Sequence, residues 1–546
     1  MIDRDEQVYD VIVVGLGPVG AAAAQLLARE GLAVLAVEPA LLPYDKPRAI
    51  GMDHEALRLL QKLGITDALG PHMGPYRPSE YRSGRGELLR RIIPQPEPYP
   101  LSWPPYCTFV QPELERLLRD GFSKWQSLEV LLGWRMTALE QEEAGVSVVI
   151  QAPESGEERR IGGRYLIGCD GAWSPVREAM GLKLEDLEFD EPWLVVDVRV
   201  NEAAVLPDAT IQYCDPARPC TFVHGPGDLR RWEIMLLPGE EPADMLKDER
   251  IWSLLSRWLT PDQGEIWRAA AYRFHALVGS AWRKGRVFVA GDAAHQTPPF
   301  MAQGLNQGLR DVGNLCWKLA DVLSGRAGIR LLDTYDEERR PNARAVIELT
   351  KSFGRLICER DPAAAAERDR KLLEEMRAGR GEIVRQDLLP PLFAGLLMKD
   401  GAGRPSPAAG TIFPQPWIET PLGLRRMDDV LAYRYLLVIS PDCHPSADDM
   451  DLAASLGVTI ARLERGMAKG PVAEIAEQGD LIAQWMKACG ASAVLVRPDH
   501  VVFGSSDKRG GERELLKELE RQLGLDSKRG EIMAAVADEP LASGIG

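Results

Sequence analysis

The sequence has little of what marks several protein classes. Only eight of its 546 residues are cysteine, and no two of them form a C-x-x-C pair. This spacing excludes a zinc knuckle and a dithiol redox motif, and it is typical of a reducing cytoplasm. The acidic residues 1–7 do not resemble a signal peptide, and three glycines and a proline interrupt the apolar run from Val11 to Ala28. We expect a cytoplasmic protein with no membrane-spanning segment.

The sequence also has fewer basic residues than acidic ones. Lys and Arg number 65 against 81 Asp and Glu, which gives a net charge of −16. Proteins that bind nucleic acids or anionic membranes need clustered cations to displace counterions, so neither partner is expected. A local basic pocket is compatible with this net charge. The apolar share of 45% and the length of 546 residues predict a globular protein of three or four structural units.

The clearest motif lies near the N-terminus. Tyr9–Val14 predicts a buried parallel strand, Gly15-Leu-Gly-Pro-Val-Gly20 follows it directly, and a helix is expected over 21–30. In this G-x-G-x-x-G pattern the glycines permit a tight turn, a close approach of the backbone to a pyrophosphate, and close helix–strand packing. Glu38 ends the next predicted strand, where an acid can accept a ribose hydroxyl. The motif predicts dinucleotide binding but does not distinguish FAD from NAD.

The remaining chain indicates an α/β protein with an inserted sheet. Between Trp193 and Met235, short extended runs separated by turn residues predict antiparallel strands. The Pro- and Tyr-rich stretch 71–105 is predicted to be irregular, and the Pro/Gly cluster 401–416 to be a linker. Further helices are predicted over 53–63, 112–122, 304–323, 332–380 with interruptions, and 507–523, and further strands over 146–150, 164–169, 286–290, 435–439 and 493–497.

Two more motifs bear on the choice of nucleotide. They are Asp170-Gly-Ala-Trp-Ser-Pro-Val-Arg177 and Gly291-Asp-Ala-Ala-His-Gln-Thr-Pro-Pro299. The acid of each follows an apolar strand, at the strand end where open α/β sheets bind ligands. Together with the first motif, they resemble those of the class A flavoprotein monooxygenases of the p-hydroxybenzoate and phenol hydroxylase type. The resemblance is closest to the 3-(3-hydroxyphenyl)propionate hydroxylase group, and its motifs cover residues 8–350.

The resemblance implies a particular domain plan. A Rossmann-like FAD-binding domain would comprise residues 1–185 and 281–400, the second part with a helical connection. An antiparallel-sheet substrate domain would be inserted at 186–280. Residues 401–546 would form a thioredoxin-like domain and a tail, which without C-x-x-C cannot perform dithiol exchange. We expect this C-terminal domain to serve packing or assembly, with a homodimer as one candidate.

The resemblance also implies an activity. It is that of a single-component aromatic hydroxylase, in which NADH or NADPH reduces FAD, O₂ forms a flavin hydroperoxide, and a phenolic substrate receives one oxygen atom. The pyridine nucleotide would bind transiently, because the chain shows no second strand–glycine turn–helix unit. Two alternatives stay open. One is a flavin halogenase, although its W-x-W-x-I-P signature is absent, and the other is a flavin-binding redox sensor or assembly protein without rapid turnover.

The same resemblance assigns FAD contacts to single positions. Asp292 would bind the ribityl chain, Asp170 would lie behind the pyrophosphate, and Arg48 would lie near the diphosphate. The family usually has Gly-Gln-Gly where this chain has Ala302-Gln-Gly304, and alanine resists a positive φ, so the backbone there is in question. The full set of expected FAD-binding residues is Gly15, Gly17, Pro18, Val19, Gly20, Glu38, Arg48, Gln111, Asp170, Asp292, Pro299, Gly304, Leu305 and Asn306.

The substrate side carries weaker signals. Tyr213, on a predicted strand of the inserted sheet, is a candidate for activating the substrate hydroxyl, or else a packed core tyrosine. His54 is a second candidate base, or else a surface or helix-capping residue. Trp193, Met235 and Tyr272, together with Tyr213, are candidates for the substrate-binding wall, or else core residues. No pair of histidines or carboxylates has metal-ligand spacing, so we expect no metal.

Overall fold

The computed structural model describes residues 8–406, 408–431, 433–464, 472–508 and 510–525. The first seven residues and the predicted C-terminal tail lie outside these ranges. The described chain divides into two compact units, one made of residues up to 313 with 342–390, the other of 314–341 with residues from 391 onward. Within the described ranges, no helix is both long and apolar enough to cross a lipid bilayer. The four-part domain plan drawn from the sequence stays a prediction.

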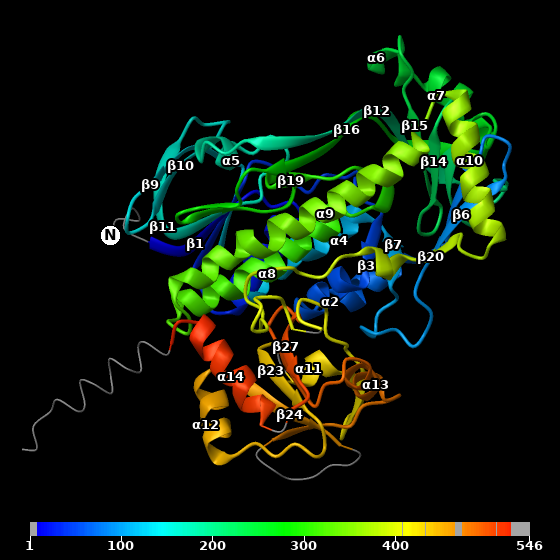
Figure 1. Ribbon diagram of the computed structural model, residues 1–546. Coiled ribbons are helices and arrows are strands. Elements are labelled where there is room, and N and C mark those ends of the chain that lie inside the picture. Colours follow the sequence, from blue (N-terminus) through cyan, green and yellow to red (C-terminus); the bar gives the residue numbers. More distant parts are fainter. Residues whose placement is uncertain (1–7, 407, 432, 465–471, 509, 526–546) are drawn as a thin grey trace, which may run out of the picture. The chain divides into compact units, whose positions relative to one another are not determined.

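A mostly parallel sheet in the first unit carries the glycine motif (Figure 1). Its strand β1 (Val8–Val14) lies between β2 (Val34–Glu38) and β11 (Glu158–Gly168) and pairs in parallel with both. Helix α1 (Pro18–Arg29) connects β1 to β2, so the predicted βαβ unit is confirmed. The other strands of this sheet are β8 (Leu128–Leu132), β9 (Arg135–Gln141), β10 (Val146–Gln151), β17 (Arg283–Lys284) and β18 (Val287–Val289).

A nine-stranded sheet forms the second layer of the first unit, in the order β19-β16-β12-β15-β14-β13-β5-β6-β20. Its central strands run antiparallel to one another, as the pattern between Trp193 and Met235 predicted. Its strands are β5 (Ser79–Ser83), β6 (Leu88–Ile93), β12 (Leu184–Val200), β13 (Thr210–Cys214), β14 (Cys220–His224), β15 (Leu229–Met235), β16 (Gly264–Gly279), β19 (His295–Gln296) and β20 (Glu382–Val384).

The prediction that residues 71–105 are irregular is wrong. Strands β5 and β6 come from this stretch, and β5 pairs in parallel with β13, which lies more than a hundred residues later. The side chains of Tyr81, Leu89 and Ile92 are buried there in a hydrophobic core. The partner strand and this core are remote in sequence, so local turn propensity could not reveal them.

Short elements connect the layers of the first unit. A three-stranded sheet has the order β3-β7-β4, and β3 leads directly into α2. These elements are β3 (Gly51–Asp53), α2 (His54–Lys62), α3 (Thr66–Leu69), β4 (Met73–Pro75), β7 (Tyr106–Phe109), α4 (Gln111–Asp120), α5 (Pro175–Ala179), α6 (Pro242–Met245), α7 (Asp248–Leu255) and α10 (Pro362–Arg377). The long helices α8 (Gly304–Leu323) and α9 (Asp333–Ile357) confirm the predicted helices in this part of the chain.

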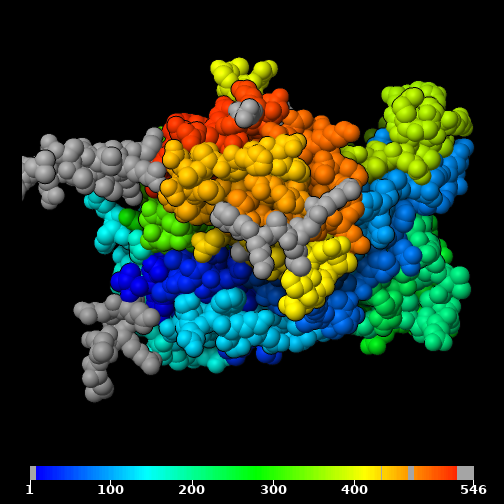
Figure 2. Space-filling view, turned by 90° about the horizontal axis from the view of Figure 1, so that it is seen from below, coloured from blue at the N-terminus to red at the C-terminus, as the bar shows by residue number. Residues whose placement is uncertain are grey.

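The second unit contains a five-stranded sheet in the order β25-β24-β23-β26-β27, a hairpin and four short helices. Figure 2 shows its surface, with the orange segment of α12 beside the red segment of α14, where Arg513 Nε donates to Asp449 Oδ1 at 2.6 Å. Its likeness to thioredoxin stays a prediction. The elements are β21 (Trp417–Thr420), β22 (Gly423–Arg426), α11 (Met427–Leu431), β23 (Tyr435–Ile439), α12 (Ala447–Ser455), β24 (Val458–Leu463), β25 (Ala473–Ile475), α13 (Leu481–Ala488), β26 (Ala493–Val496), β27 (Val502–Ser506) and α14 (Gly511–Gln522).

Candidate active site

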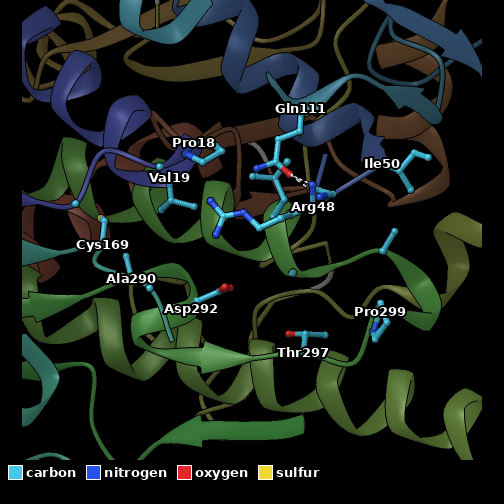
Figure 3. A pocket seen from close by; sticks show the side chains of 18 of the residues that line it. Pro18, Val19, Arg48, Ile50, Gln111, Cys169, Ala290, Asp292, Thr297 and Pro299 are labelled. Atoms are coloured by element: carbon cyan, nitrogen blue, oxygen red, sulfur yellow. Dashed lines mark hydrogen bonds between the residues drawn. The ribbon is translucent and has the colours of Figure 1, made fainter. Parts of the chain in front are cut away.

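A cavity of about 690 Å³ in the first unit joins the two layers. On one side it is lined by the glycine motif and the ends of β1, β2 and β11. On the other side it is lined by one face of the nine-stranded sheet. Figure 3 shows residues from the first and third sequence motifs directed into the same space. Three segments that are far apart in the sequence thus converge on one cavity.

The glycine motif has the geometry that its spacing predicts. Gly15 has a φ of +91°, and a Cβ atom there would lie 2.5 Å from the carbonyl oxygen of Cys169. A Cβ atom on Gly20 would lie 1.9 Å from the Gly15 oxygen, so Gly20 serves packing and does not line the cavity. Gly17 lines the cavity as the N-cap of α1, with no atom within 4 Å of the added Cβ position and no side-chain cap. The N–H groups of this helix end are open to an anion.

Two acidic residues lie in the part of the cavity that the glycine motif lines. Glu38 accepts the backbone N–H of Leu16 at 2.7 Å and that of Ala40 at 2.9 Å, so its carboxylate stabilises the glycine turn. Asp170 accepts from the hydroxyl of Ser174 at 2.5 Å and from the N–H of Val176 at 2.9 Å, and so fixes the start of α5. Burial raises the pKa of Asp170, and these hydrogen bonds oppose the rise. Both acids line the cavity.

Asp292, Arg48 and Gln111 face the cavity together (Figure 3). Asp292 projects into the cavity, and desolvation by the surrounding protein raises its pKa, while His295 and Arg48 oppose the rise. The Gln111 side-chain oxygen accepts the backbone N–H of Arg48 at 3.1 Å and that of Ala49 at 2.5 Å. Its amide nitrogen donates to Glu115 at 2.6 Å. Gln111 therefore positions the loop that carries Arg48.

The loop before α8 resolves the question raised by Ala302. This residue has φ +48° and ψ +46°, so the backbone keeps the left-handed conformation that a glycine would adopt without strain. Asn306 supports the loop from behind, because its amide donates to the Ala302 oxygen at 2.8 Å and its oxygen accepts the Asp53 N–H at 3.1 Å. Pro299, Gly304 and Leu305 line the cavity, whereas Asn306 does not.

Tyr213 does not face the cavity, and this corrects our expectation. Its hydroxyl accepts a hydrogen bond from the Trp258 indole at 3.1 Å, and its ring packs in the core on the far face of the sheet. The neighbouring Gln212 lines the cavity instead. Successive residues of a strand point to opposite faces, so Gln212 and Tyr213 cannot both face inward.

The other substrate-side candidates also lie away from the cavity. Trp193 pairs across the sheet with Met235 and Tyr272. Trp193 and Met235 are buried in a core behind Phe300, which itself lines the cavity and lies 5.6 Å from Trp193 between ring centroids. Tyr272 is 40% exposed and accepts a hydrogen bond from a buried arginine, Arg268. These residues form a layer behind the wall or lie on the surface.

His54 is buried at the start of α2 and does not line the cavity. Its Nδ1 atom has no hydrogen-bond partner among the described residues. Burial lowers the pKa of His54, which keeps the imidazole neutral. The helix cap is the preceding Asp53, whose carboxylate accepts the N–H of Ala56 at 3.1 Å. His54 is therefore not placed to exchange a proton with a ligand of the cavity.

The substrate half of the cavity is lined by residues that the sequence did not single out. Alternate positions of β13, β14 and β15 present a polar face, and β5, β7 and a segment near residue 385 complete the wall. Strand alternation could have predicted this polar face if the side of the sheet that points inward had been known. No local sequence signal marks Arg385. These residues are Tyr76, Ser79, Tyr106, Thr210, Gln212, Thr221, Arg231, Glu233 and Arg385.

Two features of the cavity suit a bound nucleotide. The open N-terminus of α1 fits a diphosphate, and Asp292 fits a polyhydroxylated chain. The residues present therefore fit FAD.

Comparison with known proteins decides the family. Residues 8–350 match the family described as FAD binding domain, and residues 410–522 match the HcaD C-terminal domain. A 3-(3-hydroxy-phenyl)propionate/3-hydroxycinnamic acid hydroxylase of Burkholderia vietnamiensis is 34% identical over 519 residues, 92% of this chain and 94% of the relative. The chain belongs to the FAD-dependent aromatic hydroxylases.

Two further comparisons extend this finding. A probable NADH-specific resorcinol 4-hydroxylase of Rhodococcus jostii is 32% identical over 517 residues, which cover 93% of this chain and 94% of the relative. The crystal structure of the flavin-dependent monooxygenase PieE with FAD and substrate superposes with a TM-score of 0.81 at 25% identity, over 95% of this chain and all of that chain. The prediction of an FAD-dependent aromatic hydroxylase that uses NAD(P)H and O₂ is confirmed.

Proposed function

We propose that this aromatic hydroxylase acts on a single-ring phenol that carries a second, anionic substituent. The observation that carries the proposal is the continuous cavity, in which the FAD residues meet a polar sheet face. Bound FAD accepts a hydride from NAD(P)H and activates O₂. The chain's own residues bind and orient the phenol and keep water from the reacting atoms, because water would divert the reaction to hydrogen peroxide.

The names of the relatives support a meta-substituted phenol. The Burkholderia relative is named for 3-(3-hydroxyphenyl)propionate and 3-hydroxycinnamic acid, and the Rhodococcus relative for resorcinol. Each of these compounds has a hydroxyl group meta to a second polar substituent. The first two carry a carboxylate, and the third does not. The two kinds of compound therefore test the anionic substituent separately.

The surroundings of Arg385 support the proposal that the substrate carries a carboxylate. Its side chain is 5% exposed, lines the cavity and lies over the Tyr106 ring, 4.0 Å from the centroid. It donates to the carbonyl oxygen of Met301, yet no carboxylate of the described residues lies within ion-pair distance of it. By contrast, Arg90 on β6 pairs with Glu375 at 2.9 Å. A buried guanidinium without an anion favours an anionic ligand.

The test is turnover by the purified protein loaded with FAD. We expect 3-(3-hydroxyphenyl)propionate to stimulate the oxidation of NADH or NADPH, with a product that is heavier by one oxygen atom and little hydrogen peroxide. If resorcinol stimulated the oxidation and 3-(3-hydroxyphenyl)propionate did not, the proposal that the substrate carries an anionic substituent would be wrong. No stimulation by any phenol, or release of all the oxygen as peroxide, would favour a redox sensor or assembly protein.

Location and assembly complete the proposal. The eight cysteines of the chain form no disulfide, which supports a reducing compartment, and we propose the cytoplasm. A homodimer is the assembly to test first, by light scattering of the purified protein at two concentrations. A monomer at both concentrations would overturn it.

A further inference from the structure

A buried carboxylate on the substrate side of the cavity lacks a hydrogen bond. Glu233 lies on β15, is 6% exposed and lines the cavity. No group of the described residues donates a hydrogen bond to it. Its ion-pair contact is with Arg231, whose Nη1 atom lies 3.9 Å from Glu233 Oε1, beyond hydrogen-bond distance. Burying a carboxylate without a donor is costly, so its presence calls for a donor from outside the chain.

Arg231 does not supply that donor, because four of its five N–H groups are directed elsewhere and its Nη1 atom lies beyond hydrogen-bond distance of Glu233. Its Nε and Nη2 atoms donate to the two oxygens of Asp197 at 2.7 and 3.1 Å. The Nη1 atom donates to the carbonyl oxygen of Arg48 at 2.7 Å. Arg268 donates to Asp197 at 3.2 Å and to Tyr272, and its Nε atom has no partner among the described residues, so it does not donate to Glu233 either. The cations near Glu233 thus serve Asp197.

The neighbouring polar residues do not supply it either. Thr221 lies directly across from Glu233 on β14, and its hydroxyl donates to the Gln212 side-chain oxygen at 2.6 Å. On the other side, Glu233 pairs with Val195 of β12, which has no polar side chain. The polar sheet face therefore presents an acceptor, Glu233, that is directed into the cavity.

We propose that Glu233 is the catalytic residue that accepts the proton of the substrate hydroxyl, an inference that rests on the proposed function. In this step the O–H bond of the phenol breaks, the proton moves to a carboxylate oxygen of Glu233, and the electron pair stays on the phenolate oxygen. The negative charge delocalises into the ring and makes the ortho and para carbons more nucleophilic. Glu233 passes the proton to solvent when the product leaves, which restores the carboxylate.

The electrostatics of the site suit this role. Burial raises the pKa of Glu233 to about 7; Arg231 and Arg268 oppose the rise, and Asp197 adds to it. These three residues, on β15, β16 and β12, are the charged groups that act on Glu233. A base whose pKa lies near the working pH is ionised often enough to act and basic enough to accept a proton.

The test is the Glu233→Gln holoenzyme, assayed with 3-(3-hydroxyphenyl)propionate and resorcinol. Gln keeps the shape of Glu but cannot accept the proton, so we expect kcat to fall about 10²- to 10⁴-fold with unchanged FAD content. The acidic limb of the wild-type pH profile, near pH 7, should disappear. The loss should shrink on fluorinated phenols, because these are more acidic and need the base less. Glu233→Asp should restore part of kcat.

The matched control is Glu80→Gln. Glu80 lies on β5 of the same sheet and is buried, but it pairs with Arg82 and Arg91 and does not line the cavity. An unchanged kcat and pH profile in Glu233→Gln would overturn the assignment, as would an equal loss on all phenols with loss of FAD. A wild-type enzyme that no phenol stimulates would overturn the proposed function and, with it, this role of Glu233.

Discussion

Arg231 donates to the backbone carbonyl oxygens of Arg48 at 2.7 Å and of Pro47 at 3.0 Å. The loop that carries Arg48 lines the FAD side of the cavity, whereas Arg231 belongs to the sheet on the substrate side. Asp197, which is fully buried, holds the guanidinium in this orientation. One buried ion pair therefore holds the two sides of the active site together.

This relationship predicts that Arg231→Met weakens FAD binding. The loop would lose two charge-assisted hydrogen bonds, each worth about 1.5–3 kcal/mol, so we expect the dissociation constant of FAD to rise at least about 100-fold. Flavin fluorescence on titration of the apoprotein measures it. Arg199→Met, on the neighbouring strand β12, is the control, because Arg199 pairs with Asp228 at the surface. Equal FAD affinities of the two variants would contradict the prediction.

Alanine substitutions at two glycines of the first motif should have different effects. Gly17→Ala meets no protein atom, so the melting temperature of the apoprotein should stay unchanged while FAD affinity falls at least about tenfold, or about 1.4 kcal/mol. Gly20→Ala overlaps the Gly15 oxygen and should destabilise the apoprotein itself by about 3 kcal/mol. Thermal unfolding of both apoproteins separates the two effects. Equal melting temperatures would show that Gly20 has no packing role.

Ala302→Gly should stabilise the protein. The substitution removes the strain of a left-handed alanine, and we expect the free energy of unfolding to rise by about 0.5–1 kcal/mol. The control is Ala294→Gly, where φ is −95° and glycine should lower stability by a similar amount. Differential scanning calorimetry compares both with wild type. Shifts of the same sign would argue against strain at Ala302.

Stability should depend on pH through Glu233. Its folded-state pKa of about 7 lies above the ordinary value of 4.5, so the folded protein keeps this proton where the unfolded chain has lost it. The contribution of Glu233 to stability therefore falls as the pH rises from about 4.5 to 7 and then levels off. The side chain introduced by Glu233→Gln does not titrate. As the pH rises from about 5 to 8, the melting temperature of this variant should therefore increase relative to that of the wild type. A constant difference across that range would indicate an ordinary pKa.

Arg385→Met should change substrate preference. We expect the KM for 3-(3-hydroxyphenyl)propionate to rise about 10- to 100-fold, since a charge-assisted hydrogen bond is worth about 1.5–3 kcal/mol. The KM for resorcinol should stay within about threefold, because resorcinol has no carboxylate to lose its partner. Arg90→Met, which removes a half-buried arginine that is paired with Glu375, is the control. A similar rise for both substrates would point to a structural role of Arg385 through Met301.

The sequence by itself determined the FAD side of the active site. Strand β1, the turn Gly15–Gly20 and helix α1 follow one another without a break, so their chemistry can be read from local order. Twelve of the fourteen expected FAD residues line the cavity, and Gly20 and Asn306 support it from behind. Such a motif folds through contacts between near neighbours, and its spacing therefore carries the geometry.

Only the tertiary structure decided the substrate side. The alternation of β13 allows either Gln212 or Tyr213 to face inward, and the choice depends on which face of the sheet the FAD-binding layer covers. Arg385 and Tyr76 reach the cavity from segments with no local pattern. Their positions depend on pairings between distant strands, such as β5 with β13 and β6 with β20. Those pairings form when the whole sheet buries its core, and short-range propensity does not encode them.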